Sequence, residues 1–308
     1  MKIVFWGSGE FALVSLKVVA NHHQILSVIT SADRREGRGL KIKSDIVKQF
    51  CLREGLKVYT PINFSPRFIS ILKGEGAELF VVVNYGRRLS REILEIPHIY
   101  SINLHPSLLP KYRGPAPINW VLINGEKKTG VSVIKINERI DAGEIIYQKE
   151  VEIGEEEDAG MLSRRLAEIG AEVLLRAIEL IRRGEVRLKV QQESMATYFP
   201  KLKKSDGEIN WRRPAKQIHN LIRGFTPQPG AFTFYKGKRI KVLKSAVEEG
   251  IKVSPSEVVR VQKRRGILVG TGEGGLWIEE LQMEGRRRMK AGEFIAGYRI
   301  KEGERLCK

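Results

Sequence analysis

An amide, an imidazole and a carboxylate occur in this chain where one reaction could use all three. Asn103 and His105 lie at the end of the run 100–105, which we expect to form a buried strand. Alternation along a strand puts these two side chains on the same face. Asp141 supplies the carboxylate further along the chain, in a predicted connection between two strands. A strand end of this kind is where an open α/β sheet presents a site.

A structural role is the alternative for Asn103 and His105. A single Asn or His at a strand end usually caps a turn or satisfies a backbone group, and the chain has five His. The longer string from Asn103 to Ile118 counts against that alternative, since Pro106 and Pro110 within it should end the strand and stiffen the loop.

That string resembles the signature of the folate-dependent formyltransferase family. The resemblance implies that Asn103, His105 and Asp141 are the catalytic residues. In the implied reaction an amine attacks a formyl carbon and forms an oxyanion, which the Asn103 amide and a protonated His105 could stabilise. Asp141 could hold the charged imidazole and accept the proton from the amine. The reaction needs no covalent enzyme intermediate and no metal.

Further positions follow from the same resemblance. The segment Ser107, Leu108, Leu109 and Pro110 matches the part of the family that lines the tetrahydrofolate site, as do Tyr85 and Gly86. A rigid loop is the structural alternative for 107–110. The chain departs from the family at 7–9, where it has Gly-Ser-Gly, and at 87–89, where Arg-Arg-Leu replaces a hydrophobic segment.

Four stretches of the second half resemble the members of the family that act on methionyl-tRNA. They are 197–202, 207–211, 218–223 and 281–294. This implies 10-formyltetrahydrofolate as the donor and the α-amino group of methionine on initiator methionyl-tRNA as the acceptor. The loop 33–43 matches the loop that meets the tRNA acceptor end in that family, with Arg38, Lys41 and Lys43 as tRNA-binding residues.

The net charge of +18 is unevenly distributed along the chain. Residues 1–186 carry 27 Lys and Arg against 23 Asp and Glu, residues 187–205 carry 5 against 1, and residues 206–308 carry 22 against 12. A strongly basic final third suggests a polyanionic partner such as RNA. A charge-rich surface of the kind found in heat-tolerant proteins is the alternative.

Strand and helix patterns alternate through the first half of the chain, which predicts an α/β domain with a Rossmann-like, doubly wound and mostly parallel sheet. We assign this domain to residues 1–186. Residues 187–205 show no sustained period and are predicted to be a linker. Short β-rich pieces between Gly-rich turns then predict a small OB-like β-barrel over 206–308. The turn at 7–9 is a weak match to a dinucleotide-binding motif, so we expect a structural turn there.

Composition excludes several other classes of protein. No apolar run approaches the roughly 18 residues that would span a membrane, and the first residues lack the cleavage region of a signal peptide. Cys51 and Cys307 are far apart and form no CxxC pair, which argues against a disulfide framework or zinc site and fits a cytoplasmic protein. Nothing in the sequence indicates an obligate protein partner.

Two other functions remain open at this point. One is a formyltransferase that acts on an amino sugar nucleotide with the same donor and the same three residues. The other is a non-catalytic RNA-binding protein on the same fold, against which the joint presence of Asn103, His105 and Asp141 counts. The basic loop and the basic final third favour tRNA over a sugar nucleotide.

Overall fold

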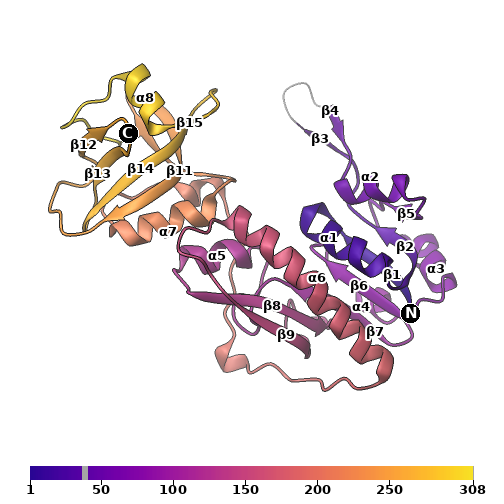
Figure 1. Ribbon diagram of the computed structural model, residues 1–308. Helices are drawn as coiled ribbons and strands as arrows, with labels where there is room; N and C mark the ends of the chain where they lie inside the picture. The colour runs from indigo at the N-terminus through magenta and orange to yellow at the C-terminus, as the bar shows by residue number, and fades with distance from the viewer. Residues whose placement is uncertain (37–40, 308) are drawn as a thin grey trace. The chain divides into compact units, whose positions relative to one another are not determined.

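The structure is a computed structural model that describes residues 1–36 and 41–307. Its chain divides into two compact units (Figure 1). The N-terminal unit comprises 1–117, 128–152 and 163–199, and the C-terminal unit comprises 118–127, 153–162 and 200–308.

A seven-stranded sheet forms the N-terminal unit, in the order β5-β2-β1-β6-β7-β8-β9. Neighbouring strands from β5 to β7 are parallel, whereas β8 and β9 are antiparallel additions at one edge. The predicted Rossmann-like, mostly parallel sheet is therefore confirmed. The strands are β1 (Lys2–Gly7), β2 (Gln24–Ile29), β5 (Val58–Tyr59), β6 (Leu79–Val83), β7 (Tyr100–His105), β8 (Lys128–Lys135) and β9 (Ile145–Glu152).

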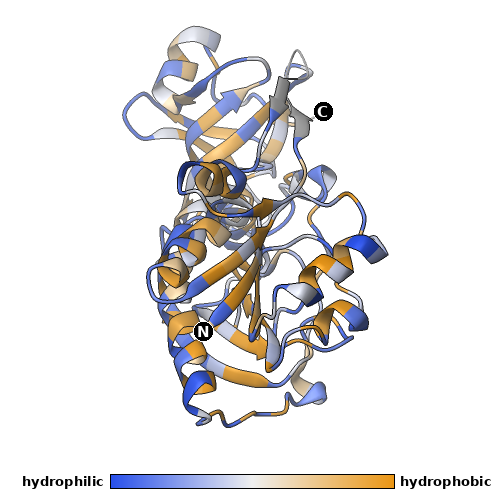
Figure 2. Ribbon diagram, turned by 90° about the vertical axis from the view of Figure 1, so that its right-hand side faces the viewer, coloured by the Kyte–Doolittle hydropathy of each residue, from blue (hydrophilic) through white to orange (hydrophobic). Residues whose placement is uncertain are grey.

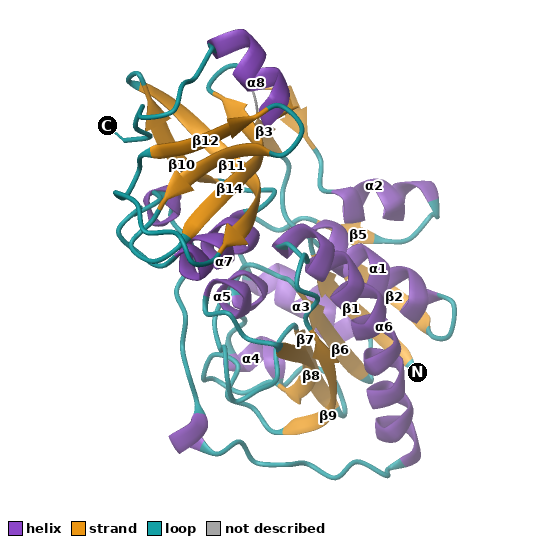
Figure 3. Ribbon diagram, turned by 60° about the vertical axis from the view of Figure 1, so that its left-hand side comes forward, coloured by secondary structure: helices purple, strands orange, loops and turns teal. Residues whose placement is uncertain are grey.

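Helices cover both faces of this sheet (Figure 3). They are α1 (Gly9–Ala20), α2 (Ile46–Arg53), α3 (Pro66–Gly74), α4 (Arg91–Leu94) and α6 (Ala159–Arg183), of which α6 enters this unit at residue 163. The helix α6 packs over β7, where Gly170 comes close to Leu104. Asn103 and His105 point to the opposite face, because side chains alternate along the strand.

Burial of apolar strands stabilises the unit. All five residues of β6 are buried, as expected of a central parallel strand that is covered on both faces. A cluster built around Trp6, Phe80, Phe68 and Leu72 fills the space under α3 and α4, and the strands are among the most hydrophobic segments (Figure 2). Each fully buried side chain of this size contributes roughly 1.5–3 kcal/mol.

The segment 33–43 differs from its predicted loop. It contains an antiparallel hairpin of β3 (Arg34–Glu36) and β4 (Lys41–Lys43). Three-residue strands rich in Arg and Lys carry no recognisable alternation, which explains why the sequence pattern did not predict them.

The turn after β1 is closed by the protein's own carboxylate. The Gly9 N–H donates to both carboxylate oxygens of Asp45 at 3.1 Å, and Asp45 also caps α2 through the Val47 N–H. A carboxylate is the natural partner of a helix N-terminus. Asp45 therefore links the turn after β1 to the start of α2.

The C-terminal unit is built on an antiparallel sheet. Five strands run in the order β10-β11-β14-β13-β12, and β15 pairs with β14. They are β10 (Ala231–Tyr235), β11 (Lys238–Glu248), β12 (Val258–Gln262), β13 (Gly266–Gly270), β14 (Gly275–Met283) and β15 (Arg288–Lys290). Three helices accompany them, namely α5 (Pro117–Ile123), α7 (Ala215–Phe225) and α8 (Ala291–Tyr298). Within the described residues no pairing joins the edge strands β10 and β12, so the sheet is open between them.

The segment 187–205 has little regular structure, apart from the short 3-10 helix η1 (Glu193–Met195) in its middle and the 3-10 helix η2 (Lys204–Gly207), which begins near its end. It nevertheless has fixed partners. Lys189 forms a bridge with Ile145, and Phe199 stacks on Tyr112 with 4.8 Å between ring centroids. Among the residues described, no helix is long and apolar enough to cross a membrane.

Candidate active site

Strand β7 brings Asn103 and His105 to the carboxyl edge of the sheet. Asn103 lies beside Val82 of β6 and Ile134 of β8, and His105 is the last residue of the strand, opposite Ser132. Residues in register on neighbouring strands point to the same face. The alternation that the sequence predicts for Asn103 and His105 is therefore present.

His105 is buried between two oxygen atoms. Its Nε2 lies 2.9 Å from the Tyr112 carbonyl oxygen, and its Nδ1 lies 3.6 Å from Oδ2 of Asp141. A carbonyl oxygen only accepts, so Nε2 must carry a proton. A second proton, on Nδ1, would face the Asp141 carboxylate. Nδ1 is thus the imidazole nitrogen that faces Asp141.

Asp141 reaches the site from the connection between β8 and β9. Its backbone is left-handed (φ 50°), a conformation that Asp and Asn tolerate better than most residues. The Gly114 N–H donates to Oδ2 at 2.9 Å, which is the same oxygen that faces His105. Within the described residues Oδ1 has no hydrogen-bond partner, and it is therefore available to accept a proton from a substrate.

Asn103 completes the group that the sequence predicts. The residue is half-buried, and none of the described residues forms a hydrogen bond with its side-chain amide. An unengaged amide beside a buried imidazole offers an N–H donor to an oxyanion. The structure brings His105 and Asp141 together at 3.6 Å and places Asn103 two residues before His105 on the same face.

The loop after β7 is held rigidly. The Ser107 hydroxyl donates to the Lys111 carbonyl oxygen at 2.8 Å, and Leu109 packs with Ile134 and Ile145. Ser107 and Leu109 thus have their side chains turned into the protein, whereas Leu108 and Pro110 are half-buried. In this loop the backbone, Leu108 and Pro110 are best placed to meet a ligand.

Tyr85 and Gly86 follow β6 at the same edge of the sheet. The Tyr85 ring lies edge-on to Trp6 at 5.5 Å, and burial raises the pKa of its phenol. Gly86 is exposed, and a Cβ at this position would meet open space. The Tyr85 ring therefore packs on the core of the sheet, whereas Gly86 faces open space.

Arg87 and Arg88, which replace a hydrophobic segment of the family, have defined partners. Arg87 donates to the Pro61 carbonyl oxygen at 2.7 Å and covers the Phe64 ring at 4.1 Å. Arg88 donates to the Glu138 carbonyl oxygen at 2.5 Å. Both arginines therefore bond to other loops of the same unit. The bond of Arg88 connects the 86–90 turn to the connection that contains Asp141.

Two residues that support the site were missed by the sequence reasoning. Arg113 is fully buried behind Gly114, and Gln191 donates hydrogen bonds to the backbone around Asp141. Arg113 lies inside the long motif string and could have been singled out as a charge in an apolar context. Gln191 lies in the predicted linker, where nothing in the local pattern indicates a contact.

The basic residues that are predicted to bind tRNA belong to the segment 33–43. Lys43 is exposed at the end of β4, and Lys41 is the first residue of that strand. Arg38 lies outside the residues that the structure describes.

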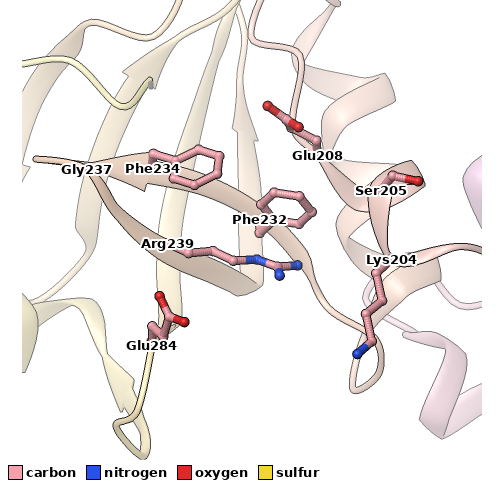
Figure 4. Close-up of a pocket in the computed structure, with 8 residues that line it drawn as sticks. All are labelled: Lys204, Ser205, Glu208, Phe232, Phe234, Gly237, Arg239 and Glu284. Carbon is pink, nitrogen blue, oxygen red and sulfur yellow. The ribbon is translucent and has the colours of Figure 1, made fainter.

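The C-terminal unit contains a separate pocket of about 450 Å³. The Arg239 guanidinium lies over the Phe232 ring at 3.6 Å, and Phe234 is the next side chain on that face of β10 (Figure 4). The lining residues are Lys204, Ser205, Glu208, Phe232, Phe234, Gly237, Arg239 and Glu284.

Comparison with known proteins places both parts of the chain in one family. Residues 1–178 match the family model described as formyl transferase, and residues 201–299 match the formyl transferase C-terminal domain. The methionyl-tRNA formyltransferase of Thermodesulfovibrio yellowstonii is 44% identical over 303 residues, covering 98% of this chain and 97% of its own. That of Geobacter sulfurreducens is 40% identical over 308 residues, covering 99% of this chain and 96% of its own.

Solved structures share the fold at much lower identity. The N-formyltransferase of Helicobacter canadensis, solved with folinic acid and dTDP-3-aminofucose, superimposes with a TM-score of 0.69 at 20% identity and covers 92% of this chain and 99% of its own. HypX of Aquifex aeolicus, solved with tetrahydrofolic acid, has a TM-score of 0.65 at 18% identity and covers 99% of this chain and 48% of its own. These two similarities describe the fold alone.

Proposed function

The chain belongs to the formyl transferase family, and we propose that it transfers the formyl group of 10-formyltetrahydrofolate to the α-amino group of methionine on initiator methionyl-tRNA. The observation that carries this function is sequence identity of 40% or more to methionyl-tRNA formyltransferases over almost the whole length of both chains. The same activity implies a cytoplasmic enzyme that supports translation initiation.

The proposed catalytic residues are Asn103, His105 and Asp141. The methionine amine attacks the formyl carbon, and the carbonyl oxygen becomes an oxyanion. The Asn103 amide donates to that oxygen, and a protonated His105 stabilises it through its positive charge, an interaction worth most in a site that excludes water. Oδ1 of Asp141, which has no partner within the described residues, accepts the proton that the amine loses, directly or through water. The intermediate then collapses: the carbonyl re-forms, the bond from the carbon to the folate nitrogen breaks, and the protonated Asp141 returns its proton to that nitrogen, directly or through water.

The folate donor fits the residues beside this group. A flat heteroaromatic ring needs apolar surfaces and a few backbone polar groups, which Tyr85, Leu108 and Pro110 and their loops supply. Gly86 leaves open space next to its backbone. We propose that Ser107 and Leu109 support this site indirectly, since their side chains hold the loop in shape.

The tRNA is assigned to the basic regions. We propose that Arg38, Lys41 and Lys43 meet the acceptor end, that residues 1–186 carry the chemistry, and that 206–308, joined through 187–205, bind the tRNA backbone. The excess of ten positive charges in 206–308 supports this assignment, from 22 Lys and Arg against 12 Asp and Glu. An OB-like barrel remains our proposal for these residues. The register shifts of β11 between Val242 and Ser245 support it, because such bulges curve a sheet toward closure.

A formyl-transfer assay tests the function. The full chain is incubated with charged initiator methionyl-tRNA and 10-formyltetrahydrofolate that is labelled in the formyl group, and formyl-methionine is measured after deacylation. A dTDP-linked amino sugar replaces the tRNA in a parallel reaction. Label on methionine alone is the expected result. Label on the sugar alone would assign the chain to the sugar N-formyltransferases, and no label on either acceptor would contradict catalysis.

Salt dependence tests the role of the basic C-terminal residues. Each neutralised phosphate releases counterions, so the affinity for tRNA should fall by about 10²-fold or more between about 50 and 200 mM salt. The exposed Lys238 and Lys263 serve as probes, and the exposed Lys2 serves as a control outside 206–308. Replacing both probes by Gln should reduce the salt slope, whereas Lys2→Gln should leave it unchanged. Equal slopes in all three proteins would mean that these charges are only a solvated surface.

A further inference from the structure

Gln191 uses its whole side-chain amide in the support of the site. Its Nε2 donates to the carbonyl oxygens of Asp141 (2.8 Å) and Gly143 (2.7 Å). Its Oε1 accepts from Nη2 of Arg113 at 2.7 Å and from Nε at 3.1 Å. Arginine only donates and carbonyl oxygens only accept, so these partners fix which end of the amide faces which neighbour. Gln191 is buried, with 6% of its surface exposed.

Arg113 holds the Oε1 end of the Gln191 amide, opposite the end that bonds to the Asp141 connection. This arginine has no exposed surface, and Glu193 accepts from its Nη2 at 2.9 Å and from its Nη1 at 3.2 Å. Tyr198 also accepts a hydrogen bond from Arg113. Glu193 in turn accepts from Arg139 at 2.7 Å, two residues before Asp141. Residues 191–198 therefore bind the 136–144 connection in two ways. Gln191 bonds to its backbone, and Glu193 bonds to the side chain of Arg139.

The connection that carries Asp141 needs such support. Asp141 itself is left-handed, and at Gly143 an added Cβ would lie 1.7 Å from the Lys135 carbonyl oxygen. A left-handed non-glycine residue persists only where its surroundings hold it. The two hydrogen bonds from Gln191 go to the residues at these tight points, on the same short stretch whose carboxylate meets His105 and the Gly114 N–H.

We propose that Gln191 is a positioning residue for formyl transfer: anchored by Arg113, it holds the Asp141 backbone so that the carboxylate stays between Gly114 and His105. The proposal rests on the proposed function for its kinetic consequence. It assigns a role in the catalytic geometry to the segment between the two halves of the chain, which the sequence pattern presents only as a connection.

The substitution Gln191→Glu tests this role with little change in size. A carboxylate still accepts from Arg113, but it cannot donate to the carbonyl oxygens of Asp141 and Gly143. The matched control is Gln192→Glu, since Gln192 is exposed and its side chain forms no hydrogen bond within the described residues. Three quantities are compared with the wild-type chain: kcat and KM for formyl transfer, the melting temperature, and the NMR signal of the Gly114 amide without substrate.

We expect kcat of Gln191→Glu to fall about 10- to 100-fold, because a displacement of the order of 1 Å in a catalytic group has such an effect. Both KM values should stay within about twofold, and the Gly114 amide should shift because its acceptor has moved. Gln192→Glu should match the wild type in all three measurements. A role in general stability alone would lower the melting temperature without this division between kcat and KM.

Two results would overturn the inference. One is wild-type kcat in Gln191→Glu, and the other is a loss of kcat with the Gly114 signal in its wild-type position, since Gln191 would then act by a route other than Asp141. The Gly114 signal is read in the free protein. It therefore still decides the inference if the wild-type chain forms no formyl-methionine, a result that would contradict the proposed function instead.

Discussion

Among the residues whose burial is described, each unit buries one histidine and one arginine, and the two pairs have different partners. In the N-terminal unit His105 faces the Asp141 carboxylate at 3.6 Å, and Arg113 is paired with Glu193 at 2.9 Å. In the C-terminal unit the corresponding groups meet only neutral acceptors. The pKa values of these buried groups therefore depend both on burial and on whether a carboxylate is bonded to them.

The C-terminal pair shows burial with neutral partners. His219 Nδ1 lies 3.0 Å from the Ser245 hydroxyl, and desolvation lowers the pKa of His219 to about 4. Arg223 donates to the carbonyl oxygens of Glu157 and Gly154 at 2.9 and 2.6 Å. Burial lowers the pKa of Arg223 as well, although the acidic run 155–158 offsets part of that effect.

The N-terminal pair shows burial with carboxylates. Burial also works against the charge of Arg113, but its bonds to Glu193 and Tyr198 outweigh this and raise its pKa. The same bond to Arg113 is the main cause that lowers the pKa of Glu193. The Glu193 carboxylate therefore stabilises the buried charge of Arg113 in the N-terminal unit, whereas burial without a bonded carboxylate lowers the pKa values of both His219 and Arg223 in the C-terminal unit.

Removing the carboxylate next to His105 should have the largest effect. Asp141→Asn keeps the shape of the side chain and tolerates the left-handed backbone, but an amide cannot accept the proton of the amine. We expect kcat of formyl transfer to fall by about 10²–10⁴-fold, the usual loss for an acid–base group. The assay with labelled donor and charged tRNA measures it, with circular dichroism as the check on folding. Near wild-type turnover would remove Asp141 from the mechanism.

Acidification should destabilise the C-terminal unit through His219. The pKa of its folded state is about 4 against 6.5 ordinarily, so the unfolded chain binds a proton first as the pH falls. The contribution is therefore present above pH 6.5 and is lost toward pH 4. It amounts to about 2.5 kcal/mol of unfolding free energy between pH 7.5 and 4.5. Urea unfolding at the two pH values measures this.

The variant His219→Gln is the control for this measurement, because glutamine does not titrate and retains polar atoms for Ser245. Its unfolding free energy should lack the component of about 2.5 kcal/mol that we assign to the histidine. If the wild type and the variant lost the same stability on acidification, His219 would not be the group that titrates, and the contrast between the units would lose one of its two supports.

Replacing each buried arginine by lysine should have the smallest effects on stability and kcat, and it compares the two units directly. A single ammonium cannot serve Gln191, Glu193 and Tyr198 together, so Arg113→Lys should cost about 1–1.5 kcal/mol of stability and reduce kcat about tenfold. Arg223→Lys should also reduce stability but leave kcat within about twofold of the wild type. Chemical denaturation and the formyl-transfer assay measure the two quantities. Equal losses of kcat would show that Arg113 has no special link to the site.

Much of the fold could be predicted because buried strands and helices have hydrophobic residues in continuous runs or at regular spacing. The strands β6, β10 and β13 follow buried runs such as Leu79–Val83, which end at turn residues. Asn103 and His105 could likewise be placed on one face from alternation alone. Their neighbour Asp141 was predicted from the family resemblance, because no local pattern connects residues 36 positions apart.

Other features have no local signal. The hairpin of β3 and β4 is too short and too charged to show alternation. The support of the site depends on a contact between Gln191 and Asp141, which are 50 residues apart in the chain. An extended segment without a period, such as 187–199, gives no indication of what it touches, because its side chains find partners only in the folded state.

The contacts of residues 189–199 also have a consequence for the order in which the N-terminal unit is completed during synthesis. A chain is made from its N-terminus, so the strands, Asp141 and α6 are all synthesised before Gln191 and Glu193. A growing chain can therefore bury the apolar faces of its sheet while Arg113 still lacks these partners and the Asp141 connection is not yet gripped. During synthesis, the residues of the sheet are therefore made before the residues that complete the support of Asp141.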